Sequence, residues 1–161
     1  MPAPYKELIA GETFIRAALN APHELLCDRL HAAVAAHLPA NSALRLLPRR
    51  TPITLSEGAE ICPDLALVRG PSSQLYLAAE VLQPGDHQPD TVLKKQLYSD
   101  ARTPRLWIVD SRYQNTEVYG SGEFGFRLET ILAGREPLTD PALTGLALSM
   151  NDLFAKANNP V

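Results

Sequence analysis

Residues 74–82 read QLYLAAEVL, a nearly continuous apolar run. Such a run is expected for a central strand that is buried on both faces of a sheet. Glu80 is the one charged residue in the run. A carboxylate in a buried strand costs free energy unless it is paired, hydrogen-bonded or bound to a metal. The stretch therefore indicates both the centre of a sheet and a candidate functional site.

A second acid lies in a second strand-like segment, residues 61–68, ICPDLALV, where Asp64 follows Pro63. If this segment and residues 74–82 are neighbouring strands, the two carboxylates can meet at one end of the sheet. Two carboxylates and a backbone carbonyl are typical ligands of a hard divalent cation such as Mg²⁺. The alternative is that each acid lies at a strand end and faces water.

The flanking segments predict an α/β fold with a mixed central sheet flanked by helices. Apolar residues at three- and four-residue steps predict an amphipathic helix that begins at His23 and ends at Pro39. Asp90 is expected to cap a second helix over 91–101. The remaining expected elements are a short helix or turn at 5–10, strands at 12–17 and 106–110, a strand-like stretch at 43–55 that is broken by prolines, a hairpin from 116–120 and 124–129, and a short helix at 149–157.

Size and composition indicate one globular domain over residues 1–161. The chain is 45% hydrophobic and carries a formal net charge of −3. An acidic chain does not bind nucleic acid through bulk charge, so DNA binding would need a local basic patch. Arg49 and Arg50 form the one adjacent pair of arginines, and either contact DNA phosphates or lie in a solvated loop. The polar N-terminus and the lack of a long apolar stretch predict a soluble cytoplasmic protein without a membrane span.

Cysteine and histidine residues do not suggest a zinc site. Cys27 and Cys62 are expected to be buried thiols in a reducing compartment. Three histidines share the first helix, and His31 lies four residues after Cys27, but nothing else completes a zinc ligand set. We expect these histidines to be solvated or packed.

Lys94 is the candidate cation of the site. In the second helix, Lys94 and Tyr98 share a face with Asp90, beside a packing stripe of Leu93, Leu97 and Ala101. An ammonium that leans over Glu80 could orient water or stabilise a phosphate oxyanion. The alternative is a solvated lysine that pairs with Asp90, whereas Lys95 should point elsewhere.

Together these motifs resemble a known family. The ordered set is PD at 63–64, EVL at 80–82, DxxxKxxxY at 90–98 and WIVD at 107–110. It resembles the Uma-type restriction endonuclease family of the PD-(D/E)xK nuclease superfamily. The opening YKELIAGE and the ending PLTDPALTGLALSMNDLF fit as well, so the resemblance covers nearly the whole chain. It implies a restriction-endonuclease-like core with a Mg²⁺-dependent nuclease site, in which Mn²⁺ can substitute.

The resemblance assigns roles to particular residues. Asp64 and Glu80 match the two acids, and the Val81 carbonyl would complete the metal ligands. The usual lysine position is Leu82, and Lys94 matches the helical lysine proposed to substitute for it, with Tyr98 packing or hydrogen-bonding nearby. The chain departs from the family pattern at Gln83, in the loop 84–89, at Arg102 where glycine is common and at Leu106 where tyrosine is common.

The leading hypothesis is an endonuclease that hydrolyses DNA phosphodiester bonds. We also expect a homodimer, formed through the hairpin at 115–129 or the first helix, because twofold symmetry presents two sites to duplex DNA. The alternative is a catalytically decayed nucleic-acid-binding or protein-interaction module on the same fold, which the acidic charge and the altered loop after Glu80 favour. Metal binding at Asp64 and Glu80 discriminates between the two. A small-molecule hydrolase is disfavoured because no nucleophile motif is present.

Overall fold

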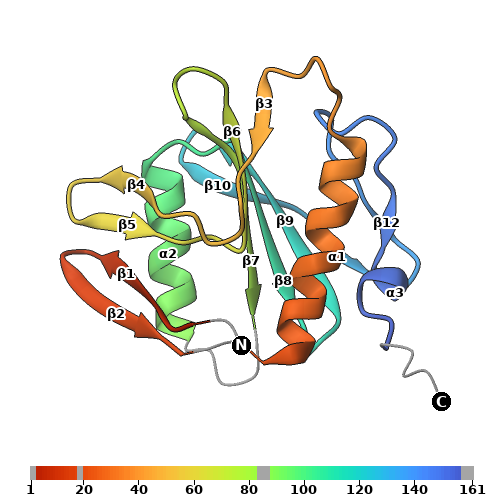
Figure 1. Cartoon of the computed structure of the whole chain (residues 1–161), viewed down its shortest axis with the longest axis horizontal. Coiled ribbons are helices and arrows are strands. Elements are labelled where there is room, and N and C mark those ends of the chain that lie inside the picture. The colour runs from red at the N-terminus through yellow and green to blue at the C-terminus, as the bar shows by residue number, and fades with distance from the viewer. Residues whose placement is uncertain (1–2, 18–19, 83–87, 157–161) are drawn as a thin grey trace.

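A six-stranded mixed sheet forms the centre of the computed structural model, which describes residues 3–17, 20–82 and 88–156, with side chains in the last range from 91 onward. Its strand order is β10-β9-β8-β7-β6-β3 (Figure 1). β7 and β8 run parallel, and the other pairs are antiparallel. The strands are β3 (Leu44–Leu46), β6 (Leu65–Arg69), β7 (Leu75–Leu82), β8 (Arg105–Asp110), β9 (Asn115–Gly122) and β10 (Gly125–Ala133). The predicted α/β class with a mixed central sheet is confirmed.

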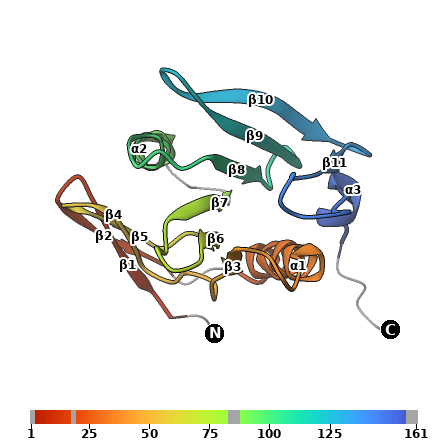
Figure 2. The ribbon, with the colours of Figure 1, turned by 90° about the horizontal axis from the view of Figure 1, so that it is seen from above.

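Two layers cover this sheet (Figure 2). One face packs against α1 (Ala21–His37), α3 (Met150–Leu153) and the short ladder of β11 (Pro137–Leu138) with β12 (Leu148–Ser149). The other face packs against α2 (Gln88–Asp100) and a second sheet of order β2-β1-β5-β4. The strands of that second sheet are β1 (Tyr5–Ile9), β2 (Glu12–Arg16), β4 (Ile53–Ser56) and β5 (Ala59–Ile61).

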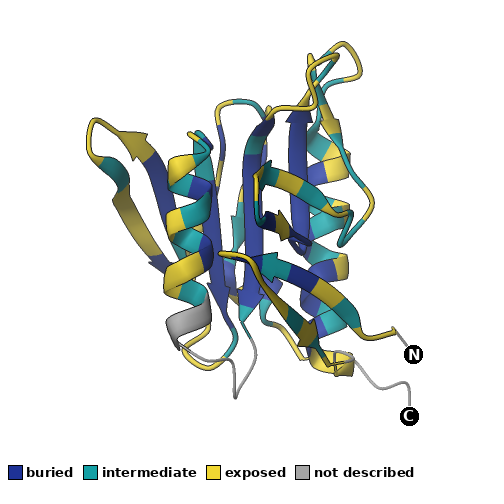
Figure 3. Cartoon of the chain, turned by 90° about the vertical axis from the view of Figure 1, so that its left-hand side faces the viewer, coloured by how far each residue is buried: buried dark blue, intermediate teal, exposed yellow. Residues whose placement is uncertain are grey.

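β7 lies at the middle of the molecule and is buried on both faces, as the apolar run predicts (Figure 3). Leu77, Ala79 and Val81 pack in the core on the α1 side, and Ala78 packs in the core on the α2 side. This alternation follows from the two-residue period of a strand. Glu80 shares the parity of Ala78, so its carboxylate faces α2 and the second sheet.

Two expected elements are corrected by the structure. Residues 5–10 do not form a short helix or turn, because Tyr5–Ile9 is a strand that pairs with both β2 and β5. The hairpin turns at Ala10 and Gly11, which both have positive φ, the backbone that a two-residue hairpin turn requires. Residues 61–68 are not one strand, because the chain leaves the second sheet at Ile61 and enters the central sheet at Leu65. Pro63, which has no backbone N–H for a sheet ladder, lies at this corner.

The helices also differ in detail from the expectation. α1 begins at Ala21, and the Asn20 side chain caps it by accepting a hydrogen bond from the His23 backbone N–H at 2.9 Å. α2 begins at Gln88, so Asp90 lies inside the helix and is not its N-cap. Leu93 is exposed and does not anchor α2, whose buried positions are Lys94 and Tyr98. Among the described residues, no helix is long and apolar enough to cross a membrane.

Candidate active site

Asp64 lies at the corner between the two sheets, one residue before β6. Its Oδ2 accepts a hydrogen bond of 2.8 Å from the backbone N–H of Val81 on β7. Leu65 pairs with Ala79 in the antiparallel β6–β7 ladder, so the corner places Asp64 beside Glu80. Asp64 Oδ1 is buried and has no hydrogen-bond partner among the described residues. That oxygen forms an ion pair with Arg50, whose Nε lies 3.5 Å away.

Glu80 is the centre of a buried polar cluster. The Lys94 ammonium lies 2.8 Å from Glu80 Oε1, and the Tyr98 hydroxyl donates a hydrogen bond of 2.5 Å to the same oxygen. Lys94 and Tyr98 are one turn apart on α2, so both reach β7 from the same face of the helix. The structure therefore brings together three of the residues that the sequence singled out. Lys95 points away, and its ammonium lies 4.3 Å from the centre of the Tyr119 ring.

Glu7 is the member of this cluster that the sequence analysis missed. Its side chain is fully buried, and Oε1 accepts hydrogen bonds from Lys94 Nζ at 2.9 Å and from the Cys62 backbone N–H at 3.0 Å. Arg16 Nε donates to the other oxygen at 2.7 Å. The signal in the sequence is a single acid in a segment whose pattern predicts a short helix or turn. Read as a strand, YKELI places Glu7 on the inward face with Ile9.

The pKa values of the two carboxylates that Lys94 contacts shift in opposite directions. Burial raises the pKa of Glu80 to about 7, an effect that the Lys94 ammonium opposes and the nearby Asp64 and Glu7 carboxylates increase. Burial acts on Glu7 in the same direction, but Lys94 and the hydrogen bonds from Cys62 and Arg16 outweigh it and lower the pKa of Glu7. Burial raises the pKa of Tyr98, and Glu80 raises it further, so this hydroxyl keeps its proton and acts as a donor.

The Val81 carbonyl, expected as a metal ligand, accepts a hydrogen bond of 2.7 Å from Nε2 of His23. A carbonyl oxygen has two lone pairs, so this bond leaves one for a cation. The His23 ring is buried and is also 3.7 Å from Asp64 Oδ2. The role of His23 is not visible in the sequence, because a histidine in the first turn of an amphipathic helix is equally compatible with simple packing.

Arg49 and Arg50 are not a free basic pair. Arg49 Nη1 lies 2.9 Å from Asp28 and 3.2 Å from Glu24, both on α1. Arg50 hydrogen-bonds Glu24 and lies beside Asp64. Both guanidinium groups therefore hold acidic side chains at the α1 edge of the site, and their contact with DNA phosphates stays a prediction.

The departures from the family pattern lie in different environments. Gln83 and residues 84–87 of the altered loop lie outside the described residues. Arg102 has φ 56°, in the left-handed region that favours glycine, just after α2 ends. Leu106 is fully buried in the core on the α2 side, where an aliphatic side chain packs without a polar partner. Neither Arg102 nor Leu106 contributes to the cluster around Glu80.

Comparison with known proteins agrees with this architecture. The profile of the Uma2 family, described as "Putative restriction endonuclease", matches residues 2–151. The crystal structure of "a putative nuclease belonging to DUF820" from Anabaena variabilis ATCC 29413 aligns with a TM-score of 0.78 and 16% identity, over 96% of this chain and 93% of that chain. A cryo-EM structure of a DrdV–DNA complex aligns with a TM-score of 0.40 and 19% identity, over 68% of this chain and 9% of that chain, too remote a likeness to bear on the fold.

No curated protein matches the chain. The family match, in contrast, spans nearly the whole sequence and includes Glu7, Asp64, Glu80, Lys94 and Tyr98. The chain therefore belongs to the Uma2 family.

Proposed function

We propose that this protein is a divalent-metal-dependent endonuclease that hydrolyses phosphodiester bonds in DNA. The observation that carries the proposal is a pair of buried acids, Asp64 and Glu80, at one end of the central sheet with the Lys94 ammonium against one of them. Asp64 Oδ1 is buried without a hydrogen bond and has an ion pair with Arg50 at 3.5 Å, so a bound cation would add a ligand contact to this oxygen. The family match and the fold of the structural neighbour support a nuclease.

The donor set fits a hard cation. Asp64, Glu80 and the Val81 carbonyl offer oxygen atoms only, which is the chemistry that Mg²⁺ prefers and Mn²⁺ accepts. When bound, the cation would polarise the scissile phosphate and activate water for attack. Asp64 is held in place by the Val81 N–H, and Glu80 by the Tyr98 hydroxyl.

Leu82 stands at the usual position of the catalytic lysine and carries no charge, so Lys94 would supply the positive charge of the site. Its ammonium would offset negative charge that develops on the phosphate, or orient the attacking water. Glu7 and Glu80 fix the ammonium by hydrogen bonds before any substrate arrives, so little reorganisation is needed during the reaction. Glu7 is a positioning residue in this mechanism, because it acts through Lys94.

Cleavage of supercoiled plasmid and of single-stranded DNA with Mg²⁺ or Mn²⁺ tests the proposal. We expect cleavage with either metal and none with chelator, and a loss of roughly 10²–10³-fold in Asp64→Asn and Glu80→Gln. Glu60→Gln is the matched control, because Glu60 is an exposed acid on β5 only four residues before Asp64.

Binding separates the proposed nuclease from a non-catalytic module on the same fold. Mn²⁺ should raise the melting temperature of the parent protein and of Glu60→Gln, but not of Asp64→Asn. If the folded parent protein neither binds metal nor cleaves DNA, the decayed binding or interaction module is the correct function.

A further inference from the structure

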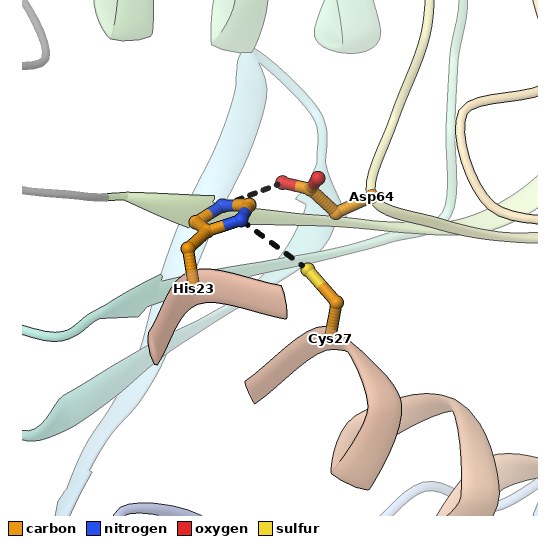
Figure 4. Close-up of side chains that lie close together, drawn as sticks. All are labelled: His23, Cys27 and Asp64. Carbon is orange, nitrogen blue, oxygen red and sulfur yellow. Dashed lines mark hydrogen bonds and ion pairs between the residues drawn. The ribbon is translucent and has the colours of Figure 1, made fainter. Parts of the chain in front are cut away.

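Three metal-ligating side chains of different chemistry gather beside the proposed Mg²⁺ site (Figure 4). His23, Cys27 and Asp64 are all buried, and one ligand atom from each lies within 4.8 Å of the others. His23 and Cys27 are one turn apart on α1, so the helix presents both on one face. Asp64 approaches them from the corner between the two sheets. The cluster thus combines an imidazole, a thiol and a carboxylate.

The His23 ring makes the hydrogen bond that is typical of a metal-binding imidazole. Nε2 lies 2.7 Å from the Val81 carbonyl oxygen, which can only accept, so Nε2 carries the proton. In the neutral ring, Nδ1 then keeps its lone pair, and this atom lies 3.8 Å from the Cys27 sulfur. Histidine ligands commonly donate their other ring N–H to a backbone carbonyl or carboxylate, which fixes the tautomer.

One Asp64 oxygen lacks a hydrogen bond. Oδ2 accepts from the Val81 N–H, but Oδ1 is buried, has no hydrogen-bond partner among residues 3–17, 20–82 and 88–156, and lies in an ion pair with Arg50 Nε at 3.5 Å. The Asp64 side chain is only 6% exposed, so water does not reach it freely. A cation bound by Cys27 and His23 would complete the coordination of this carboxylate.

We propose that His23 Nδ1, Cys27 Sγ and the Asp64 carboxylate form a site for a thiophilic divalent cation, with Zn²⁺ as the best fit. Thiolate and imidazole ligands favour Zn²⁺, whereas Mg²⁺ takes oxygen ligands almost alone. Neighbouring ligands in a tetrahedral zinc site are roughly 3–4 Å apart, close to the separation of Nδ1 and Sγ. On binding, the Cys27 S–H bond breaks, the sulfur ligates as thiolate, and the proton leaves to solvent.

The site has a consequence for the metal chemistry next to it. Asp64 belongs both to this cluster and to the proposed Mg²⁺ site, so Zn²⁺ and Mg²⁺ would compete for one carboxylate. This part rests on the proposed function, whereas Zn²⁺ binding itself does not. Zn²⁺ would then inhibit the Mg²⁺-dependent activity, and substitution of Cys27 would relieve this inhibition.

Cobalt provides the test, because Co²⁺ bound by a thiolate shows a sulfur-to-metal charge-transfer absorption. We expect this band when metal-free protein is titrated with Co²⁺, and its loss on addition of Zn²⁺. Cys27→Ser should abolish the band, and Cys62→Ser should retain it, since Cys62 is equally buried but lies against Lys6 on β1. Glu80→Gln should also retain the band, which separates this site from the proposed Mg²⁺ site.

X-ray absorption of the zinc-loaded parent protein needs no variant. We expect one sulfur ligand at about 2.3 Å and nitrogen or oxygen ligands at about 2.0–2.1 Å. Zn²⁺ should also displace Mn²⁺ from the parent protein and not from Cys27→Ser, as followed by the electron paramagnetic resonance of free Mn²⁺. A zinc spectrum without sulfur, or a cobalt band that survives Cys27→Ser, would overturn the proposed site. Mn²⁺ that binds but is not displaced from the parent protein would overturn only the competition.

Discussion

Lys94 shows how a single residue holds the site together. Its ammonium is enclosed between Glu7 and Glu80, and Tyr98 donates a hydrogen bond to Glu80 as well. Glu7 is paired with both Arg16 and Lys94, whereas Glu80 shares Lys94 and also faces Asp64, and this agrees with the opposite pKa shifts of Glu7 and Glu80. A second cation near Glu80 would favour its ionised form. That is the electrostatic argument for a metal here.

The role of Lys94 in catalysis can be tested against its neighbour. We expect Lys94→Ala to reduce DNA cleavage by roughly 10²–10³-fold, because the ammonium acts on charge that develops in the transition state. Lys95→Ala should cleave like the parent protein, since Lys95 contacts the Tyr119 ring and not the site. The assay is initial cleavage rate at a temperature where circular dichroism shows both variants folded. Equal rates in both variants would make Lys94 a purely structural residue.

Sequence reasoning reached some residues of the site and missed others for physical reasons. Asp64 and Glu80 stand out because a charged residue in an apolar strand is visible in a short window of sequence. Lys94 stands out because it lies one helical turn from Tyr98. Glu7 and His23 did not stand out, because their partners are far along the chain. Glu7 meets Lys94 87 positions later, and His23 meets Val81 58 positions later. Nothing in a local window encodes such a contact.

At the scale of elements, predictions based on periodicity succeeded where packing follows hydrophobicity. α1 and β7 bury the apolar residues that their patterns indicate. α2 departs from this rule, because it turns Lys94 and Tyr98 toward the sheet and leaves Leu93 exposed. β1 departs as well, because its strand state depends on pairing with β2 and β5, which the sequence of one segment does not specify.

The two sheets are joined through a polar contact as well as through apolar packing. Glu7 belongs to β1 of the second sheet, and Lys94 to α2, which covers the central sheet. In a double-mutant cycle with Glu7→Gln and Lys94→Met, we expect a coupling energy of about 1–3 kcal/mol, measured by urea unfolding.

A pair of surface residues serves as the reference for that cycle. Glu60 on β5 and Lys95 on α2 have no ion pair and no common side-chain partner among the described residues, so Glu60→Gln with Lys95→Met should couple by less than about 0.5 kcal/mol. A Glu7–Lys94 coupling that is no larger than this reference would show that the two sheets are held together by apolar contacts alone.

At the scale of the whole molecule, β10 is one edge strand of the central sheet and is largely exposed, seen at the left of Figure 3. A register shift at residues 128–130 places Leu128 and Ile131 opposite Tyr119 and Glu117, which share one face of β9. Leu128 and Ile131 are 44% and 48% exposed. An exposed apolar edge strand is a surface on which a second chain can pair.

We therefore expect a homodimer formed through the β9–β10 hairpin, in agreement with the advantage of two symmetric sites on duplex DNA. Ile131→Lys should give a monomer by light scattering at micromolar concentration, because it places a charge in the apolar part of the interface. Ile15→Lys is the control, since Ile15 is 71% exposed on the other sheet. A monomeric parent protein would remove the prediction, and dissociation by Ile15→Lys alone would move the interface to β2.

The contact between Glu7 and Lys94 also bears on how fast the chain folds and unfolds. Closing a loop of 87 residues is entropically costly, so contacts of this kind tend to form after the local hairpins and helices. Interactions that are absent from the transition state affect the unfolding rate and leave the refolding rate almost unchanged. In stopped-flow measurements, we expect Lys94→Met to accelerate unfolding while refolding stays within about twofold of the parent protein. A refolding rate that falls as much as unfolding rises would instead place this buried lysine in the folding nucleus.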